Sequence, residues 1–156
     1  MKQNQWYKDK VFYQIWPRSF KDGDGDGMGD LLGVYEKLDY LKELGVKLLY
    51  STPMFVSNTS HRYNTFDYMK IDPLLGTEDD LRELCDTLHQ NGMHLIMDGV
   101  FNHCGSFNKW MDHEGIYLGK AGFQPGAFQS MHSPYRSYFH FNDSANGRSP
   151  AYEGWW

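Results

Sequence analysis

The sequence has few cysteines, no long apolar run and no excess of positive charge. Its two cysteines, Cys85 and Cys104, provide no disulfide framework, so a reducing, cytoplasmic compartment is expected. No stretch approaches the roughly 20 apolar residues of a membrane span, and the first ten residues lack the apolar run of a signal peptide. The net charge of −5 argues against nucleic acid as a main partner. We therefore expect a soluble protein with no membrane or nucleic-acid partner.

The chain instead alternates short apolar runs with helical patterns, in 156 residues of which 40% are hydrophobic. Strands are predicted at 11–16, 46–50 and 95–97, and helices at 31–44 and 77–91. The second helix begins at Thr77, with Asp80 as its capping-box partner. A β-α-β-α-β order with apolar strands implies a parallel sheet with right-handed crossovers. The connection 51–76 is predicted to be a long loop, and loops of that length are usually functional.

The third strand ends in polar residues. Leu95 to Met97 form an apolar run, as expected of a strand covered on both faces, and Asp98 follows directly. Asn102 and His103 come just beyond. Polar groups at the C-terminal ends of parallel strands are where α/β proteins keep their sites. The alternative is that Asp98 only caps a turn and His103 is an ordinary loop histidine, and this segment alone does not separate the two.

A glycine-rich acidic loop follows the first strand. Ca²⁺ takes six to eight oxygen ligands, and alternate positions of this loop carry oxygen donors. The predicted metal ligands are Asp22, Asp24, Asp26, Met28 through its carbonyl oxygen, and Asp30. The loop is not an EF-hand, because Gly33 stands where the bidentate Glu is required and 16–20 is not expected to be an entering helix. The alternative is a solvated acidic turn, but its clustered like charges favour a cation.

Residues 104–156 change character. Glycine, serine, proline and aromatic residues dominate, and the periodicity is weak. We expect an irregular segment in which 137–141 is the best candidate strand. Most of its aromatic residues are expected to form a local core, although flat rings also stack on sugars. A zinc site made by His103, Cys104 and His113 is a further alternative, but these residues lack the usual ligand spacing.

Three separated stretches together resemble one family. Asp98-Gly-Val-Phe-Asn-His103 resembles the D-x-V-x-N-H signature of the α-amylase family, glycoside hydrolase family 13. Residues 13–30 resemble its first strand and metal-binding loop, and 61–77 resemble the loop after its second strand. Residues 152–156 are similar to the end of the inserted subdomain in neopullulanase-like and cyclomaltodextrinase-like members.

The resemblance implies the N-terminal part of a (β/α)8 barrel, with 1–103 supplying three strands and two helices and 104–156 an incomplete inserted subdomain. It implies a retaining glycosidase for α-glucans or maltooligosaccharides, and it allows a homodimer of the full-length protein. Tyr63 would stack under the sugar before the cleaved bond, and His103 would hydrogen-bond the same sugar. Asp98 would support the floor of the site. One departure is Asn64, where members usually have Asp after the stacking Tyr.

No catalytic residue is assigned to this chain. In this family the two reacting carboxyl groups and a third Asp come from the fourth, fifth and seventh strands, and no matching signature follows His103. The chain is therefore expected to be an N-terminal fragment that is inactive alone. Two alternatives are a non-catalytic α-glucan-binding module and a calcium-stabilised structural fragment.

Overall fold

The computed structural model describes residues 5–142, and these divide into two compact units. Unit 1 comprises residues up to 54 together with 70–99, and unit 2 comprises 55–69 together with the described residues from 100 onward. Residues 152–156, one of the stretches that carry the family resemblance, lie outside the described range. The predicted domain division after residue 103 concerns the complete barrel and stays a prediction.

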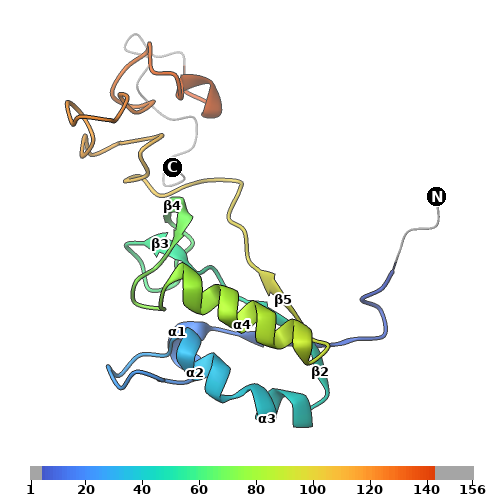
Figure 1. Ribbon diagram of the computed structural model, residues 1–156. Helices are drawn as coiled ribbons and strands as arrows, with labels where there is room; N and C mark the ends of the chain where they lie inside the picture. Colours follow the sequence, from blue (N-terminus) through green and yellow to red (C-terminus); the bar gives the residue numbers. More distant parts are fainter. Residues whose placement is uncertain (1–4, 143–156) are drawn as a thin grey trace. The chain divides into compact units, whose positions relative to one another are not determined.

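Unit 1 contains a three-stranded parallel sheet (Figure 1). Its strands are β1 (Val11–Ile15), β2 (Val46–Ser51) and β5 (His94–Met97), in the order β1-β2-β5. The register pairs Ile15 with Ser51 and Ser51 with Met97, so all three strands end at the same level. These are the three strands that the apolar runs predict.

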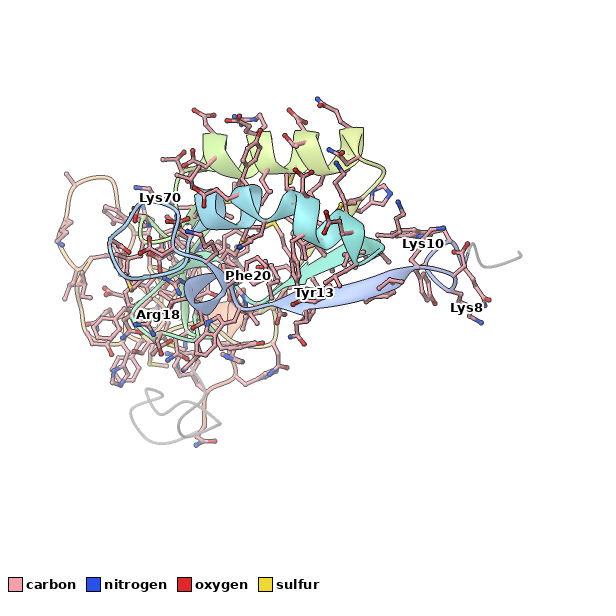
Figure 2. The ribbon with its side chains drawn as sticks, turned by 90° about the horizontal axis from the view of Figure 1, so that it is seen from below. Lys8, Lys10, Tyr13, Arg18, Phe20 and Lys70 are labelled. Atoms are coloured by element: carbon pink, nitrogen blue, oxygen red, sulfur yellow. The ribbon has the colours of Figure 1, made fainter. Side chains whose placement is uncertain are left out.

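The three longer helices of unit 1 lie on one side of the sheet (Figure 2). They are α2 (Leu31–Glu36), α3 (Leu38–Glu43) and α4 (Glu78–Gln90). The strands also follow one another across the sheet in chain order. A doubly wound sheet reverses its strand order and places helices on both faces, whereas a barrel advances in one direction with its helices outside. The arrangement is therefore that of a barrel segment.

The prediction of one continuous helix over 31–44 is wrong, because the helix is interrupted at Lys37. The backbone of Lys37 has φ −96° and ψ 8°, and its N–H donates to the carbonyls of Tyr35 and Val34 instead of continuing the α-helical pattern. The apolar positions nevertheless keep their spacing across the break. Leu31, Val34, Leu38 and Leu41 are all buried, so periodicity alone could not reveal the interruption.

Burial differs between the central strand and its neighbour β5. Leu48 and Leu49 are consecutive in β2 and both fully buried, so both faces of that strand are covered. Leu95, Ile96 and Met97 are only half-buried, which corrects the expectation of a strand covered on both faces. The physical reason is position, since β5 is an edge of the sheet whereas β2 has a neighbour on each side.

A further correction concerns the connection that follows β1. Pro17–Phe20 forms a one-turn helix, α1, where no helix was expected; Pro17 occupies its first turn, a position that does not need a backbone N–H. The ring of Phe20 packs edge-on against Tyr13 of β1, with centroids 6.4 Å apart (Figure 2). By contrast, the capping box of Thr77 and Asp80 at the start of α4 is confirmed.

The predicted loop 51–76 contains two strands, β3 (Phe55–Ser57) and β4 (Thr65–Ile71), which pair with each other. β3 is too short to show a period, and polar residues obscure the pattern of β4. The rest of unit 2 is irregular, as expected. The predicted strand at 137–141 is wrong, because Arg136–Tyr138 forms a 3₁₀ turn instead. Of the helices in residues 5–142, none has the length and hydropathy needed to cross a bilayer.

Candidate functional site

Asp98 lies at the C-terminal edge of the unit 1 sheet, where the sequence predicts it. It directly follows β5, and its backbone N–H donates to the Ser51 carbonyl at 3.0 Å, which continues the parallel ladder beyond the strand. The interaction with the Asp98 carboxylate raises the pKa of the Tyr50 hydroxyl above its ordinary value. Sequence reasoning missed Tyr50, although its position next to the end of β2 is a usable signal.

Three carboxylates of the acidic loop come together. Each of Asp22, Asp24 and Asp30 offers an oxygen, and these atoms lie within 4.8 Å of one another. Asp30 is the most buried member, at 6% exposure, and it is also the N-cap of α2. One of its oxygens accepts from the Gly33 N–H at 2.6 Å. The other accepts from the N–H groups of Gly23 and Asp24 at 3.1 and 3.0 Å, which ties the loop to the helix.

Backbone donors also hold the other carboxylates. Asp22 accepts from the N–H groups of Gly25 and Gly27, and these bonds lower its pKa. Asp26 is not part of the three-carboxylate group, and one of its oxygens accepts from the Met28 N–H at 2.7 Å. The backbone N–H groups thus offset part of the repulsion between the carboxylates, which the sequence analysis expected a cation to relieve. The three gathered carboxylates still form the hard oxygen donor set that fits Ca²⁺.

Tyr63 and His103 lie together in unit 2. The Nε2 atom of His103 is 3.0 Å from the backbone carbonyl oxygen of Tyr63. A carbonyl can only accept, so Nε2 carries the proton in this bond. The Tyr63 N–H in turn donates to Nδ1 of His61 at 3.1 Å, and the His61 and Tyr63 rings lie 5.8 Å apart. Tyr63 is 38% exposed, so part of its ring is open to a ligand.

The residues flanking Tyr63 are constrained. Arg62 has a positive φ of 61° although it is not glycine, and its side chain is buried, with Nη1 donating to the Ser60 carbonyl at 3.2 Å. The carbonyl of Asn64, the residue that departs from the family pattern, accepts from the Ser57 hydroxyl at 2.7 Å. A backbone held in a sparsely populated conformation next to a site residue is typical of binding loops.

An aromatic stack centred on Tyr68 also lies in unit 2. Tyr68 lies nearly parallel to Trp110, with ring centroids 5.5 Å apart, and its other neighbour Phe101 is 83% exposed. The Tyr68 hydroxyl lies 2.7 Å from the carbonyl oxygens of both Val100 and His103. Burial raises the pKa of Tyr68 to about 12. Tyr68 therefore fixes the chain on both sides of residues 101 and 102.

The zinc alternative is not supported. Within residues 5–142, the acidic-loop carboxylates form the only group of three or more potential His, Cys, Asp or Glu ligands, so His103, Cys104 and His113 do not converge. Burial raises the pKa of the Cys104 thiol to about 12, which keeps it protonated and a poor metal ligand.

Of the residues predicted for the sugar site, the structure brings Tyr63 and His103 together in unit 2 and places Asp98 in unit 1. Of the predicted metal ligands, it brings together Asp22, Asp24 and Asp30. The carbonyl of Met28 stays a predicted ligand.

Comparison with known proteins gives consistent matches. The family model of the alpha-amylase catalytic domain matches residues 14–155. A maltogenic alpha-amylase of Bacillus acidopullulyticus is 39% identical, over 89% of this chain and 25% of the relative. An oligo-1,6-glucosidase of Bacillus sp. (strain F5) is 40% identical, over 94% of this chain and 27% of the relative. The chain thus spans about a quarter of the length of these relatives.

Solved structures agree with the sequence matches. The crystal structure of an isomaltulose synthase from Protaminobacter rubrum superimposes with a TM-score of 0.77 at 38% identity, covering 92% of this chain and 24% of that one.

Proposed function

Because this chain belongs to the α-amylase family of catalytic domains, we propose that it forms the first part of a (β/α)8 barrel that hydrolyses α-glucosidic bonds of maltodextrins or similar α-glucans. The predicted fold class is confirmed, since the matched structures are α-amylase-family barrels and three parallel strands with helices on one side are a segment of such a barrel. The names of two relatives, a maltogenic amylase and an oligo-1,6-glucosidase, support an α-glucoside substrate.

The observation that carries the proposal is the pairing of Tyr63 with His103. An exposed part of a tyrosine ring offers a flat apolar face on which a sugar ring can stack. His103 forms a hydrogen bond with the backbone of that same tyrosine, so the imidazole is held close to the tyrosine. In the proposed role Tyr63 stacks on the sugar just before the cleaved bond. When the sugar binds, the Nε2–H of His103 turns from the Tyr63 carbonyl to a hydroxyl of that sugar. Asp98 supports the floor of the site.

Hydrolysis with retention requires a nucleophilic carboxylate and a carboxylic acid about 5–5.5 Å apart across the bond. We assign neither group to this chain. Its proposed contribution is binding and orientation of the sugar, and the 156 residues alone are expected to be inactive.

Calcium is proposed as a structural ion. Asp22, Asp24 and Asp30 would hold it, with Met28 as a further donor through its carbonyl, and the ion would neutralise the clustered negative charge. It would take no part in bond cleavage. A cytoplasmic location is also proposed, in keeping with the two free thiols of Cys85 and Cys104.

The test is an activity assay on the protein expressed from its complete reading frame. Maltotriose, isomaltose and 4-nitrophenyl α-glucoside are offered as substrates, and Tyr63→Ala is the site variant. We expect turnover by the wild type and a loss of at least tenfold in kcat/KM for the variant. Tyr35→Ala is a matched control, because Tyr35 is a tyrosine of similar exposure on α2.

The outcomes separate the candidate functions. Maltotriose that changes the tryptophan fluorescence of the wild type without being cut would establish a non-catalytic α-glucan-binding module. A melting temperature that depends on calcium, without any binding of sugar, would support the calcium-stabilised structural fragment. Turnover by the purified 156-residue chain would refute the assignment of the reacting carboxyl groups to other parts of the barrel.

A further inference from the structure

We propose that Asn108 and Gly105 are positioning residues that fix Tyr63 through the backbone of residues 64 and 65. This inference rests on the proposed function and adds to it, because it names what sets the place of the stacking ring. The two residues lie in an irregular segment that follows His103, and neither is assigned a role by the sequence argument. All of the contacts that carry the inference lie within unit 2.

Three consecutive carbonyl oxygens in the Tyr63 segment each have a hydrogen-bond donor. The carbonyl of Tyr63 accepts from His103, and the carbonyl of Asn64 accepts from Ser57. The carbonyl of Thr65 accepts twice, from the Gly105 N–H at 2.9 Å and from the Asn108 side chain at 3.3 Å. Three carbonyls held in succession leave the intervening peptide planes little freedom to rotate. The direction in which the Tyr63 side chain leaves the backbone is therefore fixed from outside the loop.

The surroundings of Asn108 orient its side chain toward the Thr65 carbonyl. It is 1% exposed, and its Oδ1 accepts from the Trp110 N–H at 2.9 Å. Since Oδ1 is occupied by a donor, the amide orientation is determined, and Nδ2 must face the Thr65 carbonyl. The backbone carbonyl of Asn108 also accepts from the N–H groups of Met111 and Asp112, which anchors the residue in its own turn. One side chain thus connects the 108–112 turn to the start of β4.

Gly105 permits the close approach that the contact needs. A Cβ atom at this position would lie 2.9 Å from the Asn64 carbonyl oxygen and 3.0 Å from Cδ1 of Phe66. The distance to the Asn64 carbonyl oxygen is shorter than a carbon atom tolerates and the distance to Phe66 is a very tight contact, so an alanine would push residues 64–66 away. The reason for glycine here is space rather than conformational freedom. The same displacement would lengthen the Gly105–Thr65 hydrogen bond and shift Tyr63, which lies two residues before Thr65.

The experiment uses two variants of the protein expressed from its complete reading frame. Asn108→Asp keeps the shape of the side chain and the acceptor for Trp110, but removes the donor to Thr65. Gly105→Ala introduces the clash. For each variant we expect KM for maltotriose to rise about tenfold while kcat per folded molecule stays within a factor of three, and we expect the Kd for a non-hydrolysed inhibitor such as acarbose to rise in parallel.

Each variant has a matched control elsewhere in the chain. Asn91→Asp removes the same kind of bond, because the Asn91 amide donates to the Thr87 carbonyl at 2.8 Å in unit 1. Gly122→Ala strains the backbone at another place in unit 2, since Gly122 has a φ of 84°. Both controls are expected to lower the melting temperature and to leave KM unchanged.

The measurements distinguish a positioning role from a structural one. If Asn108→Asp and Gly105→Ala lower only the folded fraction, with KM and Kd equal to those of the wild type, the inference is wrong and the proposed function stands. If Gly122→Ala raises KM as much as Gly105→Ala does, the effect belongs to the whole of unit 2 and the inference also fails. A wild type that neither cuts nor binds maltotriose refutes the proposed function, and the inference with it.

Discussion

Replacing Asp30 by Ala tests the connection between the acidic loop and helix α2. The substitution removes the N-cap of α2, which typically costs about 1 kcal/mol. It also removes the acceptor for the N–H groups of Gly23 and Asp24, which are part-buried, at about 1 kcal/mol each. In the opposite direction, the loss of this charge removes its repulsion from both Asp22 and Asp24, and two charges at such a separation near water repel by about 1 kcal/mol per pair. The net expectation is a destabilisation of about 1 kcal/mol.

The assay is urea denaturation followed by far-ultraviolet circular dichroism at pH 7 with a chelator, so that no cation contributes. Asp30→Asn loses the same charge and the second acceptor but retains one oxygen for the helix cap, so its cost should be about 1 kcal/mol smaller than that of Asp30→Ala. Asp39→Ala serves as the control, because Asp39 forms only an exposed ion pair with Lys42 and should matter by less than about 0.5 kcal/mol. A cost for Asp30→Ala equal to that of Asp39→Ala would refute the reasoning.

Four further outcomes are expected. Millimolar Ca²⁺ should raise the melting temperatures of the wild type and of Asp26→Ala, and it should raise the melting temperature of Asp24→Ala much less. If Ca²⁺ raises none of the three melting temperatures, the calcium proposal is wrong. Thr77→Ala should cost about 1 kcal/mol in the same urea assay, because it removes the capping box of α4; a cost under 0.3 kcal/mol would contradict this. Burial raises the pKa of the Cys104 thiol to about 12, so an aromatic disulfide reagent at pH 8 should label Cys104 only after the protein unfolds. Mass spectrometry locates the label, and rapid labelling of Cys104 in the native protein would contradict this expectation. The pKa of Tyr68 is about 12 in the folded protein and about 10 in the unfolded chain, so its contribution to stability is complete below pH 10 and is lost as the pH rises toward 12. The free energy of unfolding of Tyr68→Phe should therefore depend less on pH over that interval than that of the wild type.

The parts of the fold that follow from periodicity could be predicted from the sequence. The apolar runs predict β1, β2 and β5, and Thr77 with Asp80 predicts the start of α4, because these signals are local. The interruption at Lys37 could not be predicted, since the apolar face continues through it unchanged. β4 was missed because its partner β3 has three residues, and a pairing of this kind depends on contacts made after the chain folds.

The candidate site divides in the same way. The family signature leads to Asp98 and His103, because it places polar groups directly after an apolar run. The gathering of Asp22, Asp24 and Asp30 without Asp26 depends on how the loop folds back onto α2, and a pattern of alternating carboxylates does not contain that information. Tyr50 and Asn108 were missed for a related reason. Each acts through a partner that is distant in the sequence, Asp98 in one case and Thr65 in the other.

The parallel sheet also imposes an order of assembly during synthesis. β1 and β2 are neighbours, and they can pair once the segment containing α2 and α3 has left the ribosome. β5 joins the opposite edge of β2 only after the whole of α4 has been made, because a parallel crossover must be closed before its strands can meet. Until then the free edge of β2 is open to any other extended polypeptide. Slowing translation between residues 51 and 94 would prolong that exposure, and with it the time during which the nascent chain can misassemble.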